Sequence, residues 1–314
     1  MTVVAVALPA QATAQTPAPT PAQPVQAAMT LKLERIGGKR RTVLTRTRVR
    51  VRGSVSAYAP GETVTVSFYN RGRKVRVEQV KLQSTPQGAG YFLLGHKVSQ
   101  VGRLTVRADH PASATLGAFG AKTAGVDVLP RRVTRGSGRV AIRMLQSRLA
   151  RLGYVVGRRG SFDARTGRAV LAFRKVTGMA RTSQASRQVM SRIARGGGGF
   201  RIRFPSHGRH IEADISRQVL VLIEGGKVRR IYPTSSGTAS TPTVIGSFHV
   251  YRKTPGTNAK GMVHSAYFIR GYATHGFASV PVYPASHGCL RVPIPDALSL
   301  FHWIKIGTPV DTYH

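Results

Sequence analysis

Two stretches in which apolar and polar residues alternate constrain the fold of this chain more than any other feature. In the first stretch, Val49 to Val55 and Thr63 to Tyr69 alternate strictly, and shorter alternating runs recur as far as Leu129. Successive side chains of a strand point to opposite faces, so this pattern predicts strands that are buried on one side. Several short strands separated by glycine and proline predict a small β-sandwich over residues 29–130.

The second alternating stretch covers residues 205–314. Val219–Ile223 and Val228–Tyr232 flank the dipeptide Gly225-Gly226. Two glycines between two apolar runs are typical of a tight hairpin, because both central residues of such a turn need positive φ angles. A single helix is expected at about residues 296–305. This stretch therefore predicts a mostly β domain.

Residues 131–195 lie between these stretches and have a helical period instead. Apolar residues recur there at helical intervals, at Val140, Ile142, Leu145, Leu149 and Leu152. Asp163 is expected to cap the N-terminus of a following helix that carries Phe173. Four consecutive glycines at 196–199 then indicate a hinge over residues 196–204.

Residues 1–28 resemble the end of a secretory signal followed by a Pro/Ala linker. A short apolar run, Val3 to Ala10, precedes a possible cleavage site at Ala10-Gln11-Ala12. Lys32 is the first basic residue, so either the true start lies upstream or this segment is not a signal; we favour the first interpretation. We expect an exported protein at the cell wall or on the extracellular face of the cytoplasmic membrane. No run approaches the roughly 20 apolar residues of a transmembrane segment, so none is predicted.

The charge of the chain is strongly positive. Its 48 Lys and Arg residues exceed its 11 Asp and Glu residues, for a net charge of +37. Such a charge attracts polyanions, among them nucleic acid, anionic wall polymers and membrane surfaces. The basic residues are spread over every segment, and aromatic residues make up 7% of the chain, too few to suggest stacking platforms for bases. No specific nucleic acid is therefore expected as a partner.

The chain contains a single cysteine, Cys289, which excludes an intramolecular disulfide. A lone cysteine is more often a small buried residue than a reactive one. Here it lies in the run Ser286-His287-Gly288-Cys289-Leu290-Arg291, downstream of His275-Gly276. A thiol becomes a nucleophile beside a base, and that base needs an acceptor on its other ring nitrogen. Gly288 permits a backbone angle that would turn the Cys289 N–H into an oxyanion hole.

A zinc site is the main alternative for this group, since imidazole and thiolate both bind zinc. The ligands would be His275, His287 and Cys289. The sequence lacks the paired CxxC or HxxxH spacing that such sites usually have. We therefore expect no metal and no cofactor.

The helical stretch is similar to a known module. Its matching motifs are Leu145-Gln146-Ser147-Arg148-Leu149, Leu152-Gly153-Tyr154, Gly160-x-Phe162-Asp163 and Thr166-x-x-Ala169-Val170-x-x-Phe173. Over about fifty residues they resemble the three-helix peptidoglycan-binding domain. One departure is Arg174, where that family usually has Gln. A plain helical linker is the alternative.

The C-terminal stretch resembles the L,D-transpeptidase catalytic domain of the YkuD type. The likeness spans about 105 residues, from Ile211-Glu212-Ala213-Asp214 through Thr241-Pro242-Thr243 and Gly246-Ser247-Phe248 to the end. It implies that Cys289 is the nucleophile, His275 the general base and the Gly276 carbonyl the acceptor from that imidazole. By the same resemblance Ser286, His287 and Gly288 build the loop and oxyanion hole, Arg291 meets the donor stem peptide, and Tyr267 lends a hydroxyl to the oxyanion hole.

The strand pattern of residues 29–130 and the two resemblances together predict a multidomain fold: an N-terminal immunoglobulin-like β-sandwich, a small three-helix all-α module and a mostly β catalytic domain, the L,D-transpeptidase β-sandwich. The implied activity is the formation of peptidoglycan cross-links between third-position stem residues through a Cys289 thioacyl-enzyme. The implied partners are peptidoglycan stem peptides and glycan strands, with carbapenem-type β-lactams as inhibitors. An L,D-carboxypeptidase that trims tetrapeptide stems and a non-catalytic wall-binding protein are the alternatives.

Overall fold

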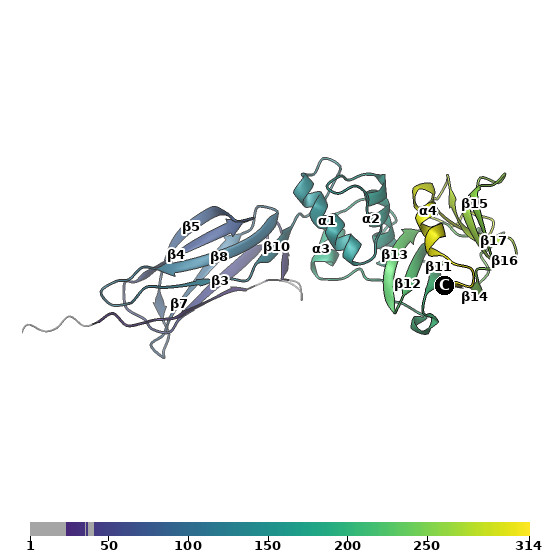
Figure 1. The fold of residues 1–314 in the computed structure, drawn as a ribbon. Helices are drawn as coiled ribbons and strands as arrows, with labels where there is room; N and C mark the ends of the chain where they lie inside the picture. The colour runs from purple at the N-terminus through teal and green to yellow at the C-terminus, as the bar shows by residue number, and fades with distance from the viewer. Residues whose placement is uncertain (1–22, 35, 37–40) are drawn as a thin grey trace, which may run out of the picture.

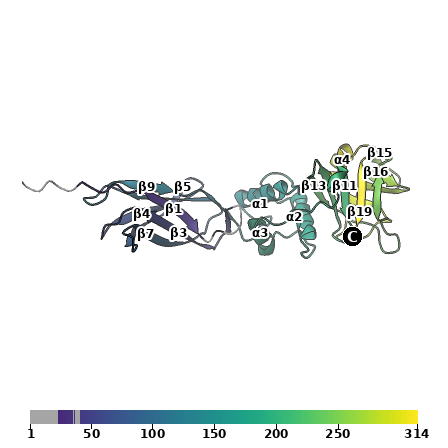
Figure 2. The same ribbon diagram turned by 90° about the horizontal axis from the view of Figure 1, so that it is seen from below.

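The computed structural model describes residues 23–34, 36 and 41–314 of the chain. Three parts follow one another along an elongated molecule: two β-sheets, a group of three helices and a β-rich C-terminal part (Figure 1). The view from below shows the same order (Figure 2). Most of the predicted signal remnant, residues 1–22, lies outside the described residues. Among the helices that are described, none has both the length and the apolar character needed to cross a bilayer.

The N-terminal part consists of two sheets that enclose one apolar core. One sheet has the order β1 (Met29–Glu34), β3 (Arg48–Val55), β7 (Gly90–Lys97) and β6 (Gln83–Ser84). The other has the order β2 (Thr42–Leu44), β10 (Val126–Leu129), β8 (Gly102–His110), β4 (Thr63–Asn70) and β5 (Arg73–Lys81), with β9 (Phe119–Lys122) on β8. Val51 and Phe92 from the first sheet meet Phe68 and Val106 from the second. Burying each such side chain contributes about 1.5–3 kcal/mol. An immunoglobulin-like relationship stays a prediction.

The three helices are α1 (Arg139–Arg151), α2 (Ala164–Val176) and α3 (Arg187–Ala194). The predicted cap of α2 is confirmed, since the Asp163 carboxylate accepts the Thr166 N–H at 2.8 Å. Arg174, the departure from the family pattern, is buried and its Nε donates to the Ala180 carbonyl at 2.6 Å. Its long side chain thus holds the loop that leads to α3. The assignment of these helices as a peptidoglycan-binding module stays a prediction.

The helices and the C-terminal sheet share one apolar core. Leu149 and Phe173 from the helices pack in the same cluster as Val221 and Ile231 from the sheet. Gly198, in the segment where we expected a hinge, lies against this core: a Cβ there would stand 2.0 Å from the Phe173 ring. The helical and C-terminal parts are therefore packed together by apolar burial as well as joined by the chain.

The C-terminal part contains two sheets and one helix. The first sheet has the order β13 (Lys227–Pro233), β12 (Val219–Glu224), β11 (His210–Asp214), β19 (Pro309–Tyr313) and β14 (Gly246–His249). The second has the order β15 (Arg252–Thr257), β16 (Val263–Ile269), β17 (Tyr272–Phe277) and β18 (Leu290–Pro293), and α4 (Ile294–Trp303) packs on its inner face. The predicted hairpin is confirmed, because Gly225 and Gly226 have φ angles of 59° and 66° between the paired residues Glu224 and Lys227. The chain described here is mostly β.

Helix α4 begins two residues before the predicted start near Asp296. Pro295 lies in its first turn, where the fixed φ of proline suits a helix and its missing N–H costs no hydrogen bond. The shift matters because it places Asp296 inside the first turn, where a carboxylate is favoured by the helix dipole.

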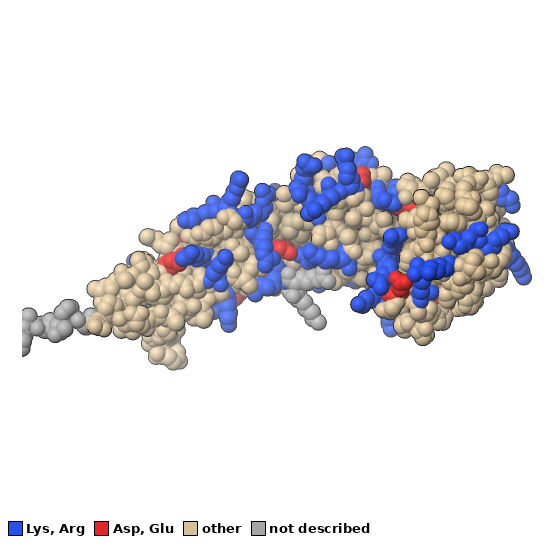
Figure 3. All heavy atoms as spheres, viewed as in Figure 1, with Lys and Arg blue, Asp and Glu red and all other residues tan. Residues whose placement is uncertain are grey.

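Basic side chains cover all three parts of the molecule on the face that Figure 3 shows, and acidic ones are few. This agrees with the even spread of Lys and Arg along the sequence. The positive charge is thus a property of the whole molecule on this face rather than of one groove.

Candidate active site

Two neighbouring parallel strands carry the predicted nucleophile and base. In the register of β17 and β18, Thr274 is opposite Leu290 and His275 is opposite Arg291. Leu290 is fully buried in the core of the C-terminal part, so Cys289 and Arg291 point to the other face of the sheet. His275 shares that face. Cys289 and His275, fourteen positions apart in the chain, therefore lie on one face of adjacent strands.

Tyr267 lies in line with the cysteine across the same sheet. It is opposite Ala273 in the register of β16 and β17. Cys289 packs against the small cluster formed by Met262, Tyr267 and Ala273. The Tyr267 ring is 8% exposed, and the Arg252 guanidinium lies 4.2 Å from its centre. The thiol thus lies next to the cluster of Met262, Tyr267 and Ala273, and the Arg252 guanidinium lies on the Tyr267 ring of this cluster.

The imidazole of His275 is held in one tautomer. Its Nδ1 lies 2.9 Å from the Gly276 carbonyl oxygen, and because a carbonyl can only accept, Nδ1 carries the proton. The lone pair is then on Nε2. Burial lowers the pKa of His275, the Gly276 carbonyl opposes this, and the positive charge of Arg291 lowers it further. The imidazole is therefore neutral, and able to accept a proton, at neutral pH.

Gly276 allows α4 to approach the strand that carries His275. A Cβ at this position would lie 2.5 Å from the Cβ of Ala297 in α4 and 3.2 Å from that of Val263. Any larger residue would push the helix away or move the carbonyl that orients the base. Gly276 thus orients the His275 imidazole through its backbone carbonyl.

The thiol of Cys289 is half-buried. Burial raises its pKa, while the Ala273 backbone N–H and the positive charges of Arg291 and Lys260 oppose this rise. Its Sγ lies 3.8 Å from the Gly271 carbonyl oxygen. The group is therefore a protonated thiol at neutral pH, and it would need a base to act as a nucleophile.

The loop before Cys289 is fixed by Ser286. The Ser286 hydroxyl donates to the Cys289 carbonyl at 2.6 Å and accepts the Gly288 N–H at 3.1 Å. Gly288 has a φ of 107°, and a Cβ there would lie 1.6 Å from the Tyr272 ring. Only glycine fits, because the backbone angle and the ring contact both exclude a side chain.

Two other predicted residues take different positions around the site. The side chain of His287 is exposed, between the buried residues Ser286 and Gly288. The Arg291 guanidinium lies 4.1 Å from the centre of the Phe277 ring, which in turn makes an edge contact with His275. The structure therefore brings Arg291 next to the base and leaves His287 facing solvent.

Hydrogen bonds from residues that were not among the predicted site residues hold β18 and the loop before it. The Thr234 hydroxyl donates to the Arg291 carbonyl at 2.8 Å, and Ser235 exchanges two backbone hydrogen bonds with Arg291 at 3.1 and 3.2 Å. Thr243 donates to the Gly288 carbonyl at 2.8 Å. Thr243 lies in a motif of the family resemblance and could have been found there. Thr234 and Ser235 carry no such signal.

The metal alternative finds no supporting cluster in the described part of the chain. There, no three His, Cys, Asp or Glu side chains lie close enough together to hold a metal ion. His287, one of the three ligands considered, faces solvent.

The family model of the L,D-transpeptidase catalytic domain, YkuD, matches residues 208–311. A search of curated proteins found no match. Among solved structures, an L,D-transpeptidase from Xylanimonas cellulosilytica is 33% identical, with 59% of this chain and 98% of that chain covered and a TM-score of 0.53.

Two other solved structures are less similar. An L,D-transpeptidase from Stackebrandtia nassauensis is 20% identical over 58% of this chain and 95% of that chain, with a TM-score of 0.38. The catalytic domain of an E. faecium L,D-transpeptidase acylated by ertapenem is 28% identical over 34% of this chain and 97% of that chain, with a TM-score of 0.29.

The family match includes the strands and the loop that carry Cys289 and His275. The Xylanimonas structure is matched over nearly its whole length. The chain therefore belongs to the L,D-transpeptidase family, and residues 208–311 are its YkuD catalytic domain.

Proposed function

We propose that this chain cross-links peptidoglycan by transferring a stem-peptide acyl group through a thioester on Cys289. The observation that carries the proposal is the common sheet face of Cys289, His275 and Tyr267, next to Arg291. A nucleophile, a base, a hydroxyl donor and a cation are the groups that acyl transfer from an anionic peptide requires.

The first half-reaction forms the thioester. Nε2 of His275 accepts the thiol proton as Cys289 Sγ bonds to the carbonyl carbon of the third stem residue. The carbon–nitrogen bond to the terminal D-alanine then breaks, and the proton passes from Nε2 to the leaving amine. A neutral imidazole with its lone pair on Nε2 suits both steps.

The second half-reaction forms the cross-link. A side-chain amine from the third residue of a neighbouring stem attacks the thioester carbonyl and gives a proton to Nε2. The carbon–sulfur bond breaks, and Cys289 recovers its proton from Nε2. The product is an amide between two third-position residues. Neither half-reaction, as proposed, uses a metal or a cofactor.

The oxyanion of each tetrahedral intermediate needs hydrogen-bond donors. The Cys289 N–H, turned by the positive φ of Gly288, and the Tyr267 hydroxyl are our candidates. Ser286 shapes this loop through its two hydrogen bonds, and His287 closes it at the surface. One such donor typically contributes about 10²–10³ in kcat.

Arg291 is our candidate for recognising the donor stem. Its guanidinium is fixed against the Phe277 ring and lies on the face of Cys289. A rigid planar cation binds a carboxylate through two parallel hydrogen bonds. We propose that it binds the carboxylate end of the tetrapeptide stem.

Water in place of the acceptor amine would make the enzyme an L,D-carboxypeptidase. The chemistry of the first half-reaction is identical, so the half-buried thiol is compatible with both outcomes. A non-catalytic wall-binding protein is less well supported, because Gly276 and Gly288 fit their tight positions around a complete cysteine–histidine pair.

The rest of the chain completes this proposal. The L,D-transpeptidase family acts on the cell wall, and we propose that this chain is exported to it. The three helices of residues 131–195 would bind glycan strands, and the sandwich of residues 29–130 would act as a spacer. The even positive charge would hold the protein near anionic wall polymers without a specific nucleic acid partner.

The test is incubation of the purified protein with defined tetrapeptide muropeptides, followed by mass spectrometry of protein and products. We expect a Cys289 acyl-enzyme that has lost D-alanine and a dimer joined between third-position residues. Tripeptide alone would establish the carboxypeptidase instead. Neither product, together with no adduct after exposure to a carbapenem, would leave the wall-binding protein as the remaining interpretation.

A further inference from the structure

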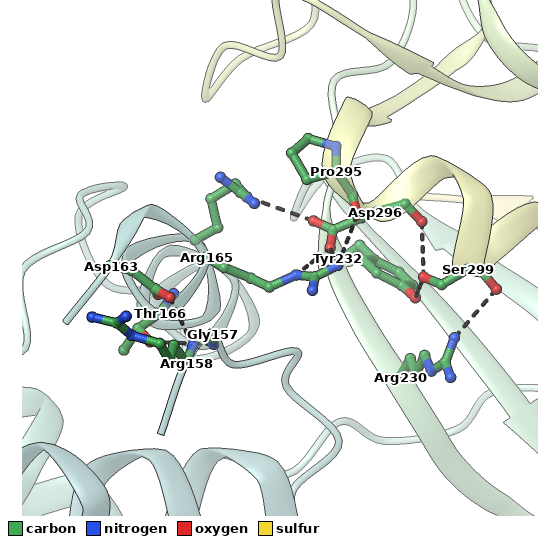
Figure 4. A network of polar contacts seen from close by, with 11 residues as sticks. Gly157, Arg158, Asp163, Arg165, Thr166, Arg230, Tyr232, Pro295, Asp296 and Ser299 are labelled. Carbon is green, nitrogen blue, oxygen red and sulfur yellow. Dashed lines mark hydrogen bonds and ion pairs between the residues drawn. The ribbon is translucent and has the colours of Figure 1, made fainter. Parts of the chain in front are cut away.

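Helix α2 of the helical part is bound to the catalytic part at two points, each of which includes one buried charged side chain. At the first, Arg165 Nε and a terminal nitrogen lie 2.7 and 2.5 Å from Asp296 Oδ1 (Figure 4). Arg168 Nε lies 3.6 Å from Asp296 Oδ2. Arg165 also donates to the Pro295 carbonyl at 2.8 Å. Asp296 is 2% exposed, and a carboxylate at such depth depends on its cations, so α2 holds the start of α4 in place.

The first turn of α4 also packs against β17 at Gly276, next to the proposed base His275. Ala297, next to Asp296, is the residue that approaches Gly276, whose carbonyl accepts the hydrogen bond from Nδ1–H of His275. A displacement of α4 would therefore change the support of that carbonyl. The chain of contacts runs from Arg165 through Asp296 and Ala297 to Gly276 and the imidazole.

At the second point, Lys175 enters the catalytic part, and within the described part of the chain its nitrogen has no carboxylate partner. It is 3% exposed, and its Nζ donates to the carbonyl oxygens of Gln218 and Thr234 at 3.1 and 3.0 Å. Both acceptors are neutral. Burial, together with the charge of Arg181, lowers the pKa of Lys175 to about 7. A buried ammonium on neutral acceptors is costly, which suggests a role beyond stabilising the fold.

Thr234 connects Lys175 with Arg291, the residue proposed to bind the donor stem. Its carbonyl accepts from Lys175, and its hydroxyl donates to the Arg291 carbonyl at 2.8 Å. The neighbouring Ser235 is hydrogen-bonded to Arg291 through the backbone. Lys175 thus fixes the segment on which the position of Arg291 depends.

We propose that α2 positions the two halves of the catalytic site, with Arg165 acting through α4 on His275 and Lys175 acting through Thr234 on Arg291. This proposal rests on the proposed function, because it assigns the contact of Arg165 with Asp296 to the acyl-transfer step and the contact of Lys175 with Thr234 to binding of the donor stem. We call these two contacts the anchors of α2. The helical part is then a working component of the catalytic unit, in addition to any wall binding. Arg165 and Lys175 are positioning residues and touch no reacting atom.

The test compares Arg165→Met and Lys175→Met in the full chain with the exposed control variants Arg195→Met and Lys227→Met. The measurements are kcat and KM for a donor tetrapeptide and the rate at which iodoacetamide alkylates Cys289 at pH 7. We expect Arg165→Met to lower kcat and alkylation about tenfold with KM unchanged. We expect Lys175→Met to raise KM about tenfold and to slow alkylation far less than Arg165→Met does, because it displaces Arg291, whose charge is a smaller influence on the pKa of Cys289 than burial is.

Three further variants, Thr234→Val, Arg165→Lys and Arg165→Gln, separate an effect on positioning from an effect on folding. Circular dichroism and gel filtration show whether each variant is folded. Thr234→Val keeps the carbonyl that Lys175 binds and removes the hydroxyl that holds Arg291, so it should reproduce the rise in KM. Arg165→Lys keeps a cation beside Asp296 and should restore most of kcat. If Lys175→Met does not fold, Thr234→Val tests the second contact in its place. If Arg165→Met does not fold, the first contact is tested by comparing Arg165→Lys, which should keep most of kcat, with Arg165→Gln, which should lose it.

The proposal is overturned if folded Arg165 and Lys175 variants, or Thr234→Val, behave like the two controls. It is also overturned if both anchors change kcat and KM alike, since that pattern indicates general loosening. If the wild-type protein forms no acyl-enzyme, the proposed function fails. Alkylation of Cys289 in the same variants still shows whether α2 positions the thiol–imidazole pair.

Discussion

The Nδ1–H group of His275 donates to the carbonyl of its own neighbour, Gly276, at 2.9 Å. A base and its orienting acceptor thus occupy consecutive positions of one strand. The arrangement needs no third side chain to fix the tautomer, and it leaves Nε2 on the face of the sheet where Cys289 lies.

The first prediction concerns pH. Burial and the nearby Arg291 hold the pKa of His275 below its ordinary value of 6.5. As pH falls through this lowered pKa, the imidazole becomes protonated and the base is lost. The acid limb of kcat/KM should therefore have its midpoint below pH 6.5. Steady-state kinetics with a donor tetrapeptide between about pH 4 and pH 8 measure this midpoint.

The same shift predicts a loss of stability in acid. The unfolded chain takes up the His275 proton near pH 6.5, before the folded protein does. The free energy of unfolding contributed by this group is thus fully present above that pH and falls as pH drops toward the folded pKa. Urea unfolding of wild type and His275→Gln should show a steeper decline in the wild type. Equal slopes would contradict the depressed pKa.

The second prediction separates the three residues of the thiol site. Cys289→Ala should abolish the acyl-enzyme and cross-linking, while binding to sacculi persists because the helices are intact. His275→Ala should lower kcat by about 10²–10⁴, the usual contribution of a general base. His287→Ala should be milder, because the His287 side chain faces solvent.

Muropeptide analysis by mass spectrometry measures all three variants. Cross-linking by Cys289→Ala would refute the proposed mechanism. A large loss in His287→Ala would instead assign that imidazole a direct part in the reaction.

The third prediction concerns Gly288, whose φ is 107° and whose missing side chain makes room for Tyr272. Gly288→Ala should cost about 3 kcal/mol or more of unfolding free energy, from backbone strain and overpacking together. Gly256→Ala is the matched control. Its φ is 76° and nothing lies within 4 Å of an added Cβ, so only the strain of about 1–2 kcal/mol remains.

Urea denaturation of both glycine variants gives the comparison. The Gly288 variant should also lose transpeptidation, because the Cys289 N–H turns with the loop. Similar costs at the two positions would show that the Tyr272 ring moves aside easily.

The fourth prediction tests the hydroxyl of Tyr267. Tyr267→Phe should lower kcat by about 10²-fold, the typical effect of removing one oxyanion donor, with little change in KM. Tyr251→Phe is the control, because Tyr251 is exposed and its hydroxyl donates to the Arg270 carbonyl. Steady-state kinetics with the donor tetrapeptide distinguish the two. Wild-type kcat in Tyr267→Phe would remove this residue from the oxyanion hole.

Several local features were predictable because they depend on neighbours in the chain. The hairpin at Gly225-Gly226 follows from the positive φ that each turn position needs, and the Asp163 cap follows from an acceptor placed before an apolar helical run. The alternation around Cys289 follows from strand geometry, which sets Leu290 inward and its neighbours outward. The family motif predicted the chemistry on Cys289 and His275 in the same way, from a short stretch of sequence.

The sequence alone thus determined the periodicities, the turns and the residue types of the thiol site, because each depends on interactions over a few positions. The tertiary structure alone decided which strands lie next to each other, and with them the pairing of His275 with Arg291. It also decided the contacts of Lys175 with Thr234 and of Arg165 with Asp296, which join residues 59 and 131 positions apart. Such contacts arise from the packing of whole elements, which no local pattern encodes.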